Sequence, residues 1–181
     1  MTLQTSGAIS LANVQSEFGG SNPISLSEYY AGGSYVPSGT SGTYGPVPSS
    51  GAIEIKDFYG TSASLDTQTV TIGSYTVKSL TYYGYASASP SAFGSISDGT
   101  FNVKSGASIT SFYHHVSGNT ITFGISGAHT NAGWTTVNIA GTNLTRASAS
   151  FSNSTNTSWT WSNQGNLFGT TLSATKVCTF T

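Results

Sequence analysis

Residues 64–181 consist of short runs in which apolar and polar side chains alternate, and this pattern constrains the fold more than any other feature of the sequence. Thr67–Ile72 is typical, because threonine occupies every second position. A period of two predicts half-buried β-strands, since successive side chains of a strand point to opposite faces. Turn-forming pairs such as Asp98-Gly99 and Ala140-Gly141 separate the runs. We therefore predict a mostly β fold, an antiparallel β-sandwich of about nine short strands, with an open barrel as the alternative.

The candidate strands share this alternation, and no run of helical periodicity interrupts them. They are Thr67–Ile72, Tyr75–Tyr82, Phe101–Lys104, Ala107–Val116, Thr120–Ile125, Trp134–Ile139, Leu144–Phe151, Ser158–Ser162 and Thr175–Thr181.

The first third of the chain contains a different pattern, a six-residue motif that occurs three times. Each copy ends in Ile-x-Leu or Ile-x-Ile, and an apolar or aromatic residue follows three places later. Ser10 can cap a short helix that Gly19 ends, and Ser25 with Glu28 forms a capping box for a second one. The third copy predicts about one helical turn before Gly60. The copies are Ser6–Leu11, Ser21–Leu26 and Ser50–Ile55.

Helices this short need a partner, because isolated helices below about 12–15 residues are marginal in water. We expect their apolar faces to pack on the β domain, on a symmetry mate or on another protein. Residues 34–49 are rich in Gly, Ser and Pro and predict an extended linker. We therefore interpret residues 1–63 as an N-terminal anchor segment of short helices and linker, and 64–181 as the β-sandwich domain. The predicted anchor residues are Ile9, Leu11, Val14, Phe18, Ile24, Leu26, Tyr29, Tyr30, Ile53, Ile55 and Phe58.

Charged residues make up only 6% of the chain, and the net charge is −1. Because the few Lys and Arg residues are scattered, nucleic acid is not an expected partner. Such a low charge gives little repulsion between copies, which suits a subunit held inside an assembly. We see neither a secretory signal nor an apolar run long enough to span a bilayer, so we expect synthesis in a cytoplasm and no membrane insertion.

Few residues could carry chemistry. Glu17, Glu28, Glu54 and Asp57 lie in the repeat region, where capping or surface roles suffice, and Asp66 and Asp98 are weak candidates for a glycosidase pair. The neighbours His114 and His115 should point to opposite faces of a strand, and with His129 they offer too few ligands for a metal. The single cysteine, Cys178, is interpreted as a small buried hydrophobe. We predict no catalytic residue, no metal and no cofactor, and therefore no enzyme.

The tryptophans support two hypotheses. Trp134, Trp159 and Trp161, with Tyr82, Tyr83, Tyr85 and Tyr113, would suit a platform on which sugar rings stack. The same side chains would also fill a core that is poor in Leu and Ile, and we favour this second interpretation. Trp159 and Trp161 are two residues apart and should share one face of a strand.

Several phrases of the sequence resemble those of virion structural proteins of tailed bacteriophages, particularly marine and cyanobacterial phages. The resemblance rests on Ser6–Leu11, Glu17–Tyr30, Val36-Pro37, Ser50–Ile53, Gly133–Thr136, Leu144–Ala149, Trp159–Trp161, Phe168–Thr171 and Ala174–Val177. It implies a non-enzymatic component of the virion that is made in the host cytoplasm. A tail fibre, baseplate or tail-tip subunit is the expected role. A capsid decoration or head-fibre protein and a carbohydrate-binding module for host-surface glycans are the alternatives.

The resemblance also bears on partners. Other virion proteins are the expected ones, and a homo-oligomer is expected too, with a trimer as one option because fibres and decorations commonly use three-fold axes. A glycan on the host surface is the further partner considered.

Overall fold

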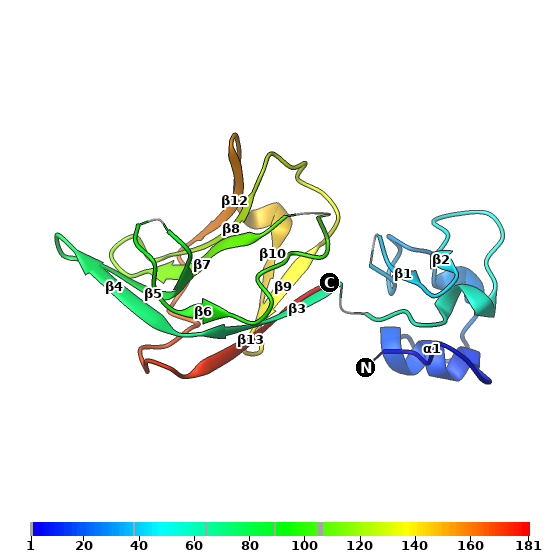
Figure 1. Ribbon diagram of the computed structural model, residues 1–181. Coiled ribbons are helices and arrows are strands. Elements are labelled where there is room, and N and C mark those ends of the chain that lie inside the picture. The colour runs from blue at the N-terminus through cyan, green and yellow to red at the C-terminus, as the bar shows by residue number, and fades with distance from the viewer. Residues whose placement is uncertain (1, 38, 64, 89, 105–106) are drawn as a thin grey trace. The chain divides into compact units, whose positions relative to one another are not determined.

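The architecture is seen in a computed structural model, which describes residues 2–37, 39–63, 65–88, 90–104 and 107–181 (Figure 1). The chain forms two compact units. The N-terminal unit comprises Met1–Leu65 with the short stretches Gly133–Thr135 and Thr181, and the sandwich unit comprises Asp66–Ala132 and Thr136–Phe180.

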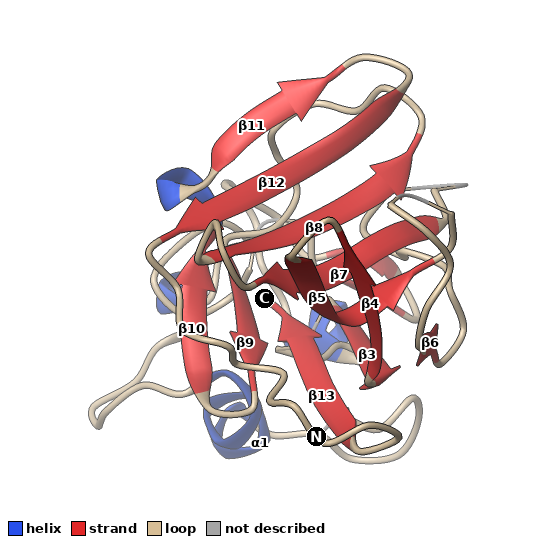
Figure 2. Cartoon of the chain, turned by 90° about the vertical axis from the view of Figure 1, so that its left-hand side faces the viewer, coloured by secondary structure: helices blue, strands red, loops and turns tan. Residues whose placement is uncertain are grey.

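The sandwich unit contains two antiparallel sheets (Figure 2). The five-stranded sheet has the order β10-β9-β13-β3-β6, and the six-stranded sheet has the order β11-β12-β8-β7-β5-β4. A 3₁₀ turn, Arg146–Ser148, joins β10 to β11. This confirms the predicted mostly β, antiparallel fold, with eleven strands in the described part of this unit. Their bounds are β3 (Asp66–Thr71), β4 (Gly73–Val77), β5 (Leu80–Ala86), β6 (Ser95–Ile96), β7 (Ile109–His115), β8 (Thr120–Ser126), β9 (Thr136–Ile139), β10 (Thr142–Thr145), β11 (Ser150–Asn153), β12 (Asn156–Ser162) and β13 (Thr175–Phe180).

Three predicted strands were wrong in detail. The run Tyr75–Tyr82 is a hairpin, because Lys78 and Ser79 adopt φ angles of 47° and 68° and turn the chain between β4 and β5. Two-residue turns of this kind usually contain Asn or Gly, and Lys78-Ser79 has neither, so no local signal predicts the turn. The run Leu144–Phe151 is broken by the 3₁₀ turn, and Phe101–Lys104 is a turn closed by a hydrogen bond from the Lys104 N–H to the Phe101 carbonyl oxygen.

Aromatic rings fill the space between the two sheets. Phe180 on β13 lies 4.8 Å, centroid to centroid, from Phe123 on β8 and 6.1 Å from Phe112 on β7. Phe123 in turn stacks on Trp159 of β12 at 5.7 Å. Each ring buries a large apolar area, so a few aromatics supply the core of a chain that has little leucine.

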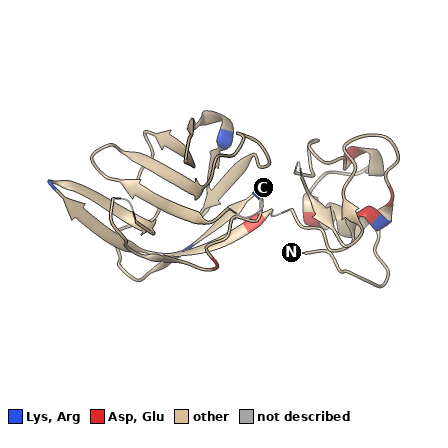
Figure 3. Ribbon diagram, turned by 45° about the horizontal axis from the view of Figure 1, so that its top comes forward, with Lys and Arg blue, Asp and Glu red and all other residues tan. Residues whose placement is uncertain are grey.

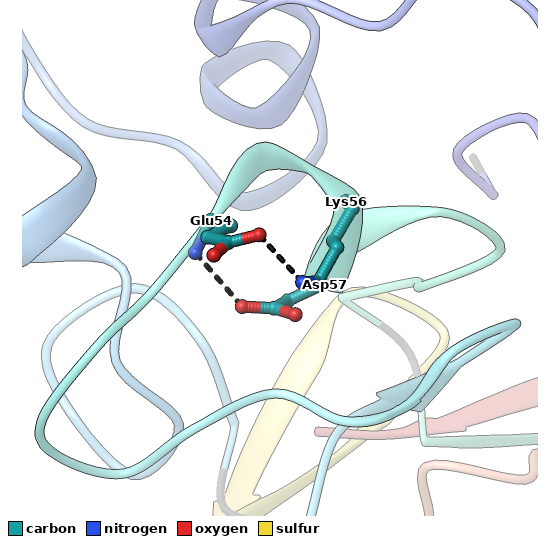
Figure 4. A network of polar contacts seen from close by, with 3 residues as sticks. All are labelled: Glu54, Lys56 and Asp57. Atoms are coloured by element: carbon teal, nitrogen blue, oxygen red, sulfur yellow. Dashed lines mark hydrogen bonds and ion pairs between the residues drawn. The ribbon is translucent and has the colours of Figure 1, made fainter.

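The N-terminal unit is built on three helix starts of the same design. The helix α1 (Leu11–Phe18) and the 3₁₀ helices η1 (Leu26–Glu28) and η2 (Ile55–Phe58) each begin with a capping box. In η2 the Asp57 carboxylate accepts from the Glu54 N–H at 2.8 Å (Figure 4). A short hairpin, β1 (Ser41–Gly42) with β2 (Gly45–Pro46), lies between η1 and η2 in the chain.

The repeated motif places one apolar residue just before each N-cap and one four residues after it, the arrangement known as a hydrophobic staple. The residues four places after the N-caps are Val14, Tyr29 and Phe58, and all three have an exposed fraction of 0%. Phe58 lies 6.3 Å from Tyr29 and 6.1 Å from Phe18, ring centroid to ring centroid. The three helix starts therefore share one core.

This core corrects the expectation that the short helices need a partner outside their own segment. Their apolar faces pack on one another, and Val36 and Val47 from the predicted linker join the same buried cluster. The segment 34–49 is thus part of the folded unit in its described residues and not a free spacer. Each helix would be marginal in isolation, which is why the sequence suggested an outside partner. In the folded unit the three helix starts and the two valines bury apolar surface against one another, and this packing stabilises all of them.

We expect Phe58→Ala to lower the free energy of unfolding of the N-terminal unit by about 3–5 kcal/mol, because it leaves a cavity where three helix starts meet. Urea titration with amide hydrogen exchange at Gly19 and Thr61 measures the loss. Tyr44→Ala is the control, since Tyr44 is 65% exposed and should cost less than about 1 kcal/mol. Equal effects of the two substitutions would contradict the shared core.

Candidate functional site

The predicted anchor residues divide into two groups. Val14, Phe18, Tyr29 and Phe58 are buried in the core of the N-terminal unit, so they are not available to a partner. The others keep part of their surface exposed. Six of them pack against that core, namely Ile9, Leu11, Ile24, Leu26, Ile53 and Ile55, and Tyr30 is partly exposed as well. Of the predicted anchor residues, only the second group can contribute to an attachment surface on this unit.

The tryptophans do not form a glycan platform. Trp134, Trp159 and Trp161 are at most 1% exposed, so no sugar ring can stack on them. Trp159 donates from Nε1 to the Asn131 side-chain oxygen at 2.8 Å, and Trp161 donates to the Thr145 carbonyl oxygen at 2.7 Å. The glycan hypothesis for these three residues was wrong, and the core interpretation is confirmed, because a strand face that carries two indoles gains more from burial than from display.

Figure 3 marks the acidic positions in red, and the four acidic side chains of the N-terminal unit, Glu17, Glu28, Glu54 and Asp57, all have partners inside that unit. Glu17 accepts from the Ala63 N–H at 3.0 Å, and Glu28 accepts from the Ser25 N–H at 2.9 Å. Asp57 caps η2, and Glu54 pairs with the Lys56 ammonium at 2.6 Å on the surface. Glu28 and Asp57 therefore cap helix starts, Glu54 has a surface role, and Glu17 joins α1 to the backbone at Ala63.

The two carboxylates of the sandwich unit share one amide. Gln68 on β3 donates from Nε2 to Asp66 at 3.0 Å, to Asp98 at 3.1 Å and to the Thr100 carbonyl oxygen at 2.8 Å. Asp66 also accepts from the Asn102 N–H, and Asp98 accepts from the Thr100 N–H. The network ties the loop after β6 to β3. It brings together the two residues that the sequence offered as a glycosidase pair, but gives both of them a structural task.

Asp66 is 5% exposed, and burial is the main reason why its pKa is raised above the ordinary value of 3.8. The nearby Asp98 charge raises it further, whereas hydrogen bonds from Gln68 and Asn102 oppose the shift. A carboxyl group with a raised pKa is a familiar sign of a general acid. Here the Asp66 carboxyl group already has structural partners, because it accepts hydrogen bonds from Gln68 and Asn102, so its burial needs no catalytic explanation.

The histidines and the cysteine are also occupied. His114 faces the interior and is hydrogen bonded through Nε2 to the Gln164 carbonyl oxygen, whereas His115 lies on the opposite face, as predicted. His129 contacts the Ser126 carbonyl oxygen. Cys178 is fully buried, which confirms its interpretation as a small hydrophobe, and burial raises the pKa of its thiol to about 12.

Within the described ranges, no group of three or more His, Cys, Asp or Glu side chains gathers where it could hold a metal ion. None of the helices in that part of the chain is long and apolar enough to cross a membrane.

Sequence reasoning missed an aromatic cluster on the outer face of the six-stranded sheet. Tyr82 stacks on His115 at 4.6 Å and meets Tyr113 edge-on at 5.4 Å. Tyr75 and Phe93 complete the cluster, with Phe93 6.0 Å from Tyr113. The signal that could have predicted this cluster is the hairpin turn at Lys78-Ser79, because a turn at that point pairs Tyr75 with Tyr82 across β4 and β5. Tyr82 and Tyr113 were named as glycan candidates, and unlike the tryptophans they remain partly exposed.

Asp66→Asn should cost about 1–3 kcal/mol at neutral pH, because in either orientation its amide nitrogen faces a donor of Gln68 or Asn102. The folded state of the wild type binds the Asp66 proton more tightly than the unfolded chain does. Its contribution to the free energy of unfolding therefore grows as the pH falls through the folded pKa, and is complete below 3.8. Urea titrations at about pH 7 and about pH 4 should show the wild type gaining stability relative to Asp66→Asn on acidification. A difference that shrinks at low pH would refute the assignment.

Cys178 should resist thiol reagents in the folded protein, since a pKa of about 12 leaves on the order of one thiolate in ten thousand at about pH 8. Unfolding in urea should restore rapid labelling. In a Cys178→Ala background, Val177→Cys is the control, because residue 177 is 53% exposed and its thiol should react at once. Rapid labelling of folded wild type would contradict the buried position.

Comparisons with known proteins add no relative to this picture. A scan of protein-family models finds none that matches the chain, and searches of curated proteins and of solved structures find no match either. The function of the chain has to follow from its own residues and contacts.

Proposed function

We propose that this protein is a non-enzymatic structural subunit of a tailed-phage virion, a tail component present in several copies. In this proposal the N-terminal unit attaches the subunit to other virion proteins, and the sandwich unit is the part presented to the surroundings.

The observation that carries the proposal is the use of the ionisable side chains. All six carboxylates accept hydrogen bonds or pair with a cation inside their own unit. The three histidines hold carbonyl or hydroxyl groups, and the thiol of Cys178 is buried. General acid–base catalysis most often uses such a group, positioned toward a substrate. Ionisable side chains that cap helices and connect loops to strands are typical of a structural protein.

The N-terminal unit supports the attachment role. It folds around its own core, so its binding surface is already formed before it meets a partner. A preformed surface avoids the entropy cost of ordering on binding. The exposed parts of Ile9, Leu11, Ile24 and Leu26 supply apolar contact area on the same unit. The low charge of the whole chain fits a subunit that is surrounded by other proteins.

Immunogold electron microscopy of gradient-purified particles tests the proposal, with antibodies raised against the sandwich unit. Label confined to the tail is the expected result, and antibody preabsorbed with purified protein is the control. Label on the head would favour the capsid decoration alternative. Particles that carry no label, with the protein found only in the unassembled fraction of the lysate, would refute a virion role.

A further inference from the structure

The sandwich unit has a groove on the outer face of its six-stranded sheet, next to the aromatic cluster. It crosses β7, β8 and β12, has a volume of about 290 Å³ and is formed by described residues of this one unit. Six of its lining residues define its shape and chemistry: Ser111, Tyr113, Thr122, Gly124, Asn156 and Ser158.

The groove exists because small residues face outward in one row of the sheet. Ser111 on β7, Gly124 on β8 and Ser158 on β12 lie side by side in register. A Cβ atom at Gly124 would lie 2.4 Å from the Ser111 hydroxyl oxygen, so any larger residue would displace that hydroxyl. The next row, Tyr113 and Thr122, is taller and forms a wall.

The wall is held rigidly. Tyr113 contacts Tyr82 edge-on at 5.4 Å and Phe93 at 6.0 Å, ring centroid to ring centroid. Tyr82 is fixed in turn by its stacking on His115. A ring supported in this way can receive a flat apolar ligand face without losing conformational freedom.

The lining selects one class of ligand. It contains hydroxyl groups and one side-chain amide, and no Asp, Glu, Lys or Arg. A charged ligand would lose water without gaining a partner, and a wholly apolar one would cover the hydroxyls without satisfying them. The side chains of Ser111, Ser158 and Asn156 make no hydrogen bond to the described residues and can both donate and accept.

We propose that this groove binds a neutral hexose unit, with the hydroxyls and the amide bonding to the sugar hydroxyls and Tyr113 contacting the apolar face of the ring. A volume of about 290 Å³ lies near the lower end of the ~300–1,000 Å³ found for small-molecule sites, which fits a short saccharide. The inference goes beyond the structural role and does not depend on it, since a sugar binds or fails to bind wherever the subunit sits.

Saturation-transfer NMR on the full chain tests the proposal with four probes: glucose, galactose, mannose and N-acetylglucosamine. At least one should bind with a millimolar dissociation constant, and galacturonate should bind at least about threefold more weakly than galactose because no cation meets its carboxylate. Absence of binding for all four neutral sugars would overturn the proposal, and so would tighter binding of galacturonate.

Substitutions locate the site. Ser158→Gln fills the groove and should weaken binding at least about tenfold, whereas Ser162→Gln, on the same face of β12 but outside the groove, should leave it unchanged. Asn156→Ala lies at an exposed strand end and tests the amide should Ser158→Gln fail to fold. Tyr113→Phe keeps the ring and should retain binding, and Tyr113→Leu should lose it. Binding that survives both Ser158→Gln and Asn156→Ala would show that the sugar binds elsewhere and refute the assignment.

Discussion

The sandwich unit depends on aromatic rings packed between its sheets. Phe112, Phe123 and Phe180 meet at centroid distances of 4.8 to 6.1 Å, and Trp159 covers one side of them. Because charged residues are only 6% of the sequence, surface ion pairs contribute little, and burial has to supply the stability. This requirement explains why the tryptophans point inward. A chain with so few large aliphatic side chains cannot leave its indoles on the surface.

The N-terminal unit also depends on a small set of buried residues, because its three short helix starts stabilise one another. None of them is long enough to persist alone, yet each contributes one fully buried residue to a common core. Their capping boxes satisfy the backbone groups that short helices leave open. The segment predicted as an anchor therefore folds around its own core. The predicted anchor residues that remain partly exposed are the ones that can contribute to an attachment surface.

Scarcity of charge also shapes what the protein can do. The carboxylates, histidines and thiol hold caps, loops and core, so the surface that remains for a ligand is made of hydroxyls, amides and tyrosine. The groove beside Tyr113 has this composition. Structural rigidity and recognition of a neutral ligand thus draw on different side chains, and the two proposals for the protein do not compete for residues.

The sequence by itself determined the strand-rich class, the site of the change from helical to alternating pattern, and the caps at Ser10 and Ser25, because period and capping are local properties. It also separated His114 from His115, since alternation along a strand depends on neighbours alone. The tertiary structure decided the turn at Lys78-Ser79, the burial of the tryptophans and the shared core of Val14, Tyr29 and Phe58. It also decided the register that sets Ser111 beside Gly124 and Ser158. These features depend on contacts between segments far apart in the chain, and no local pattern encodes which segments will meet.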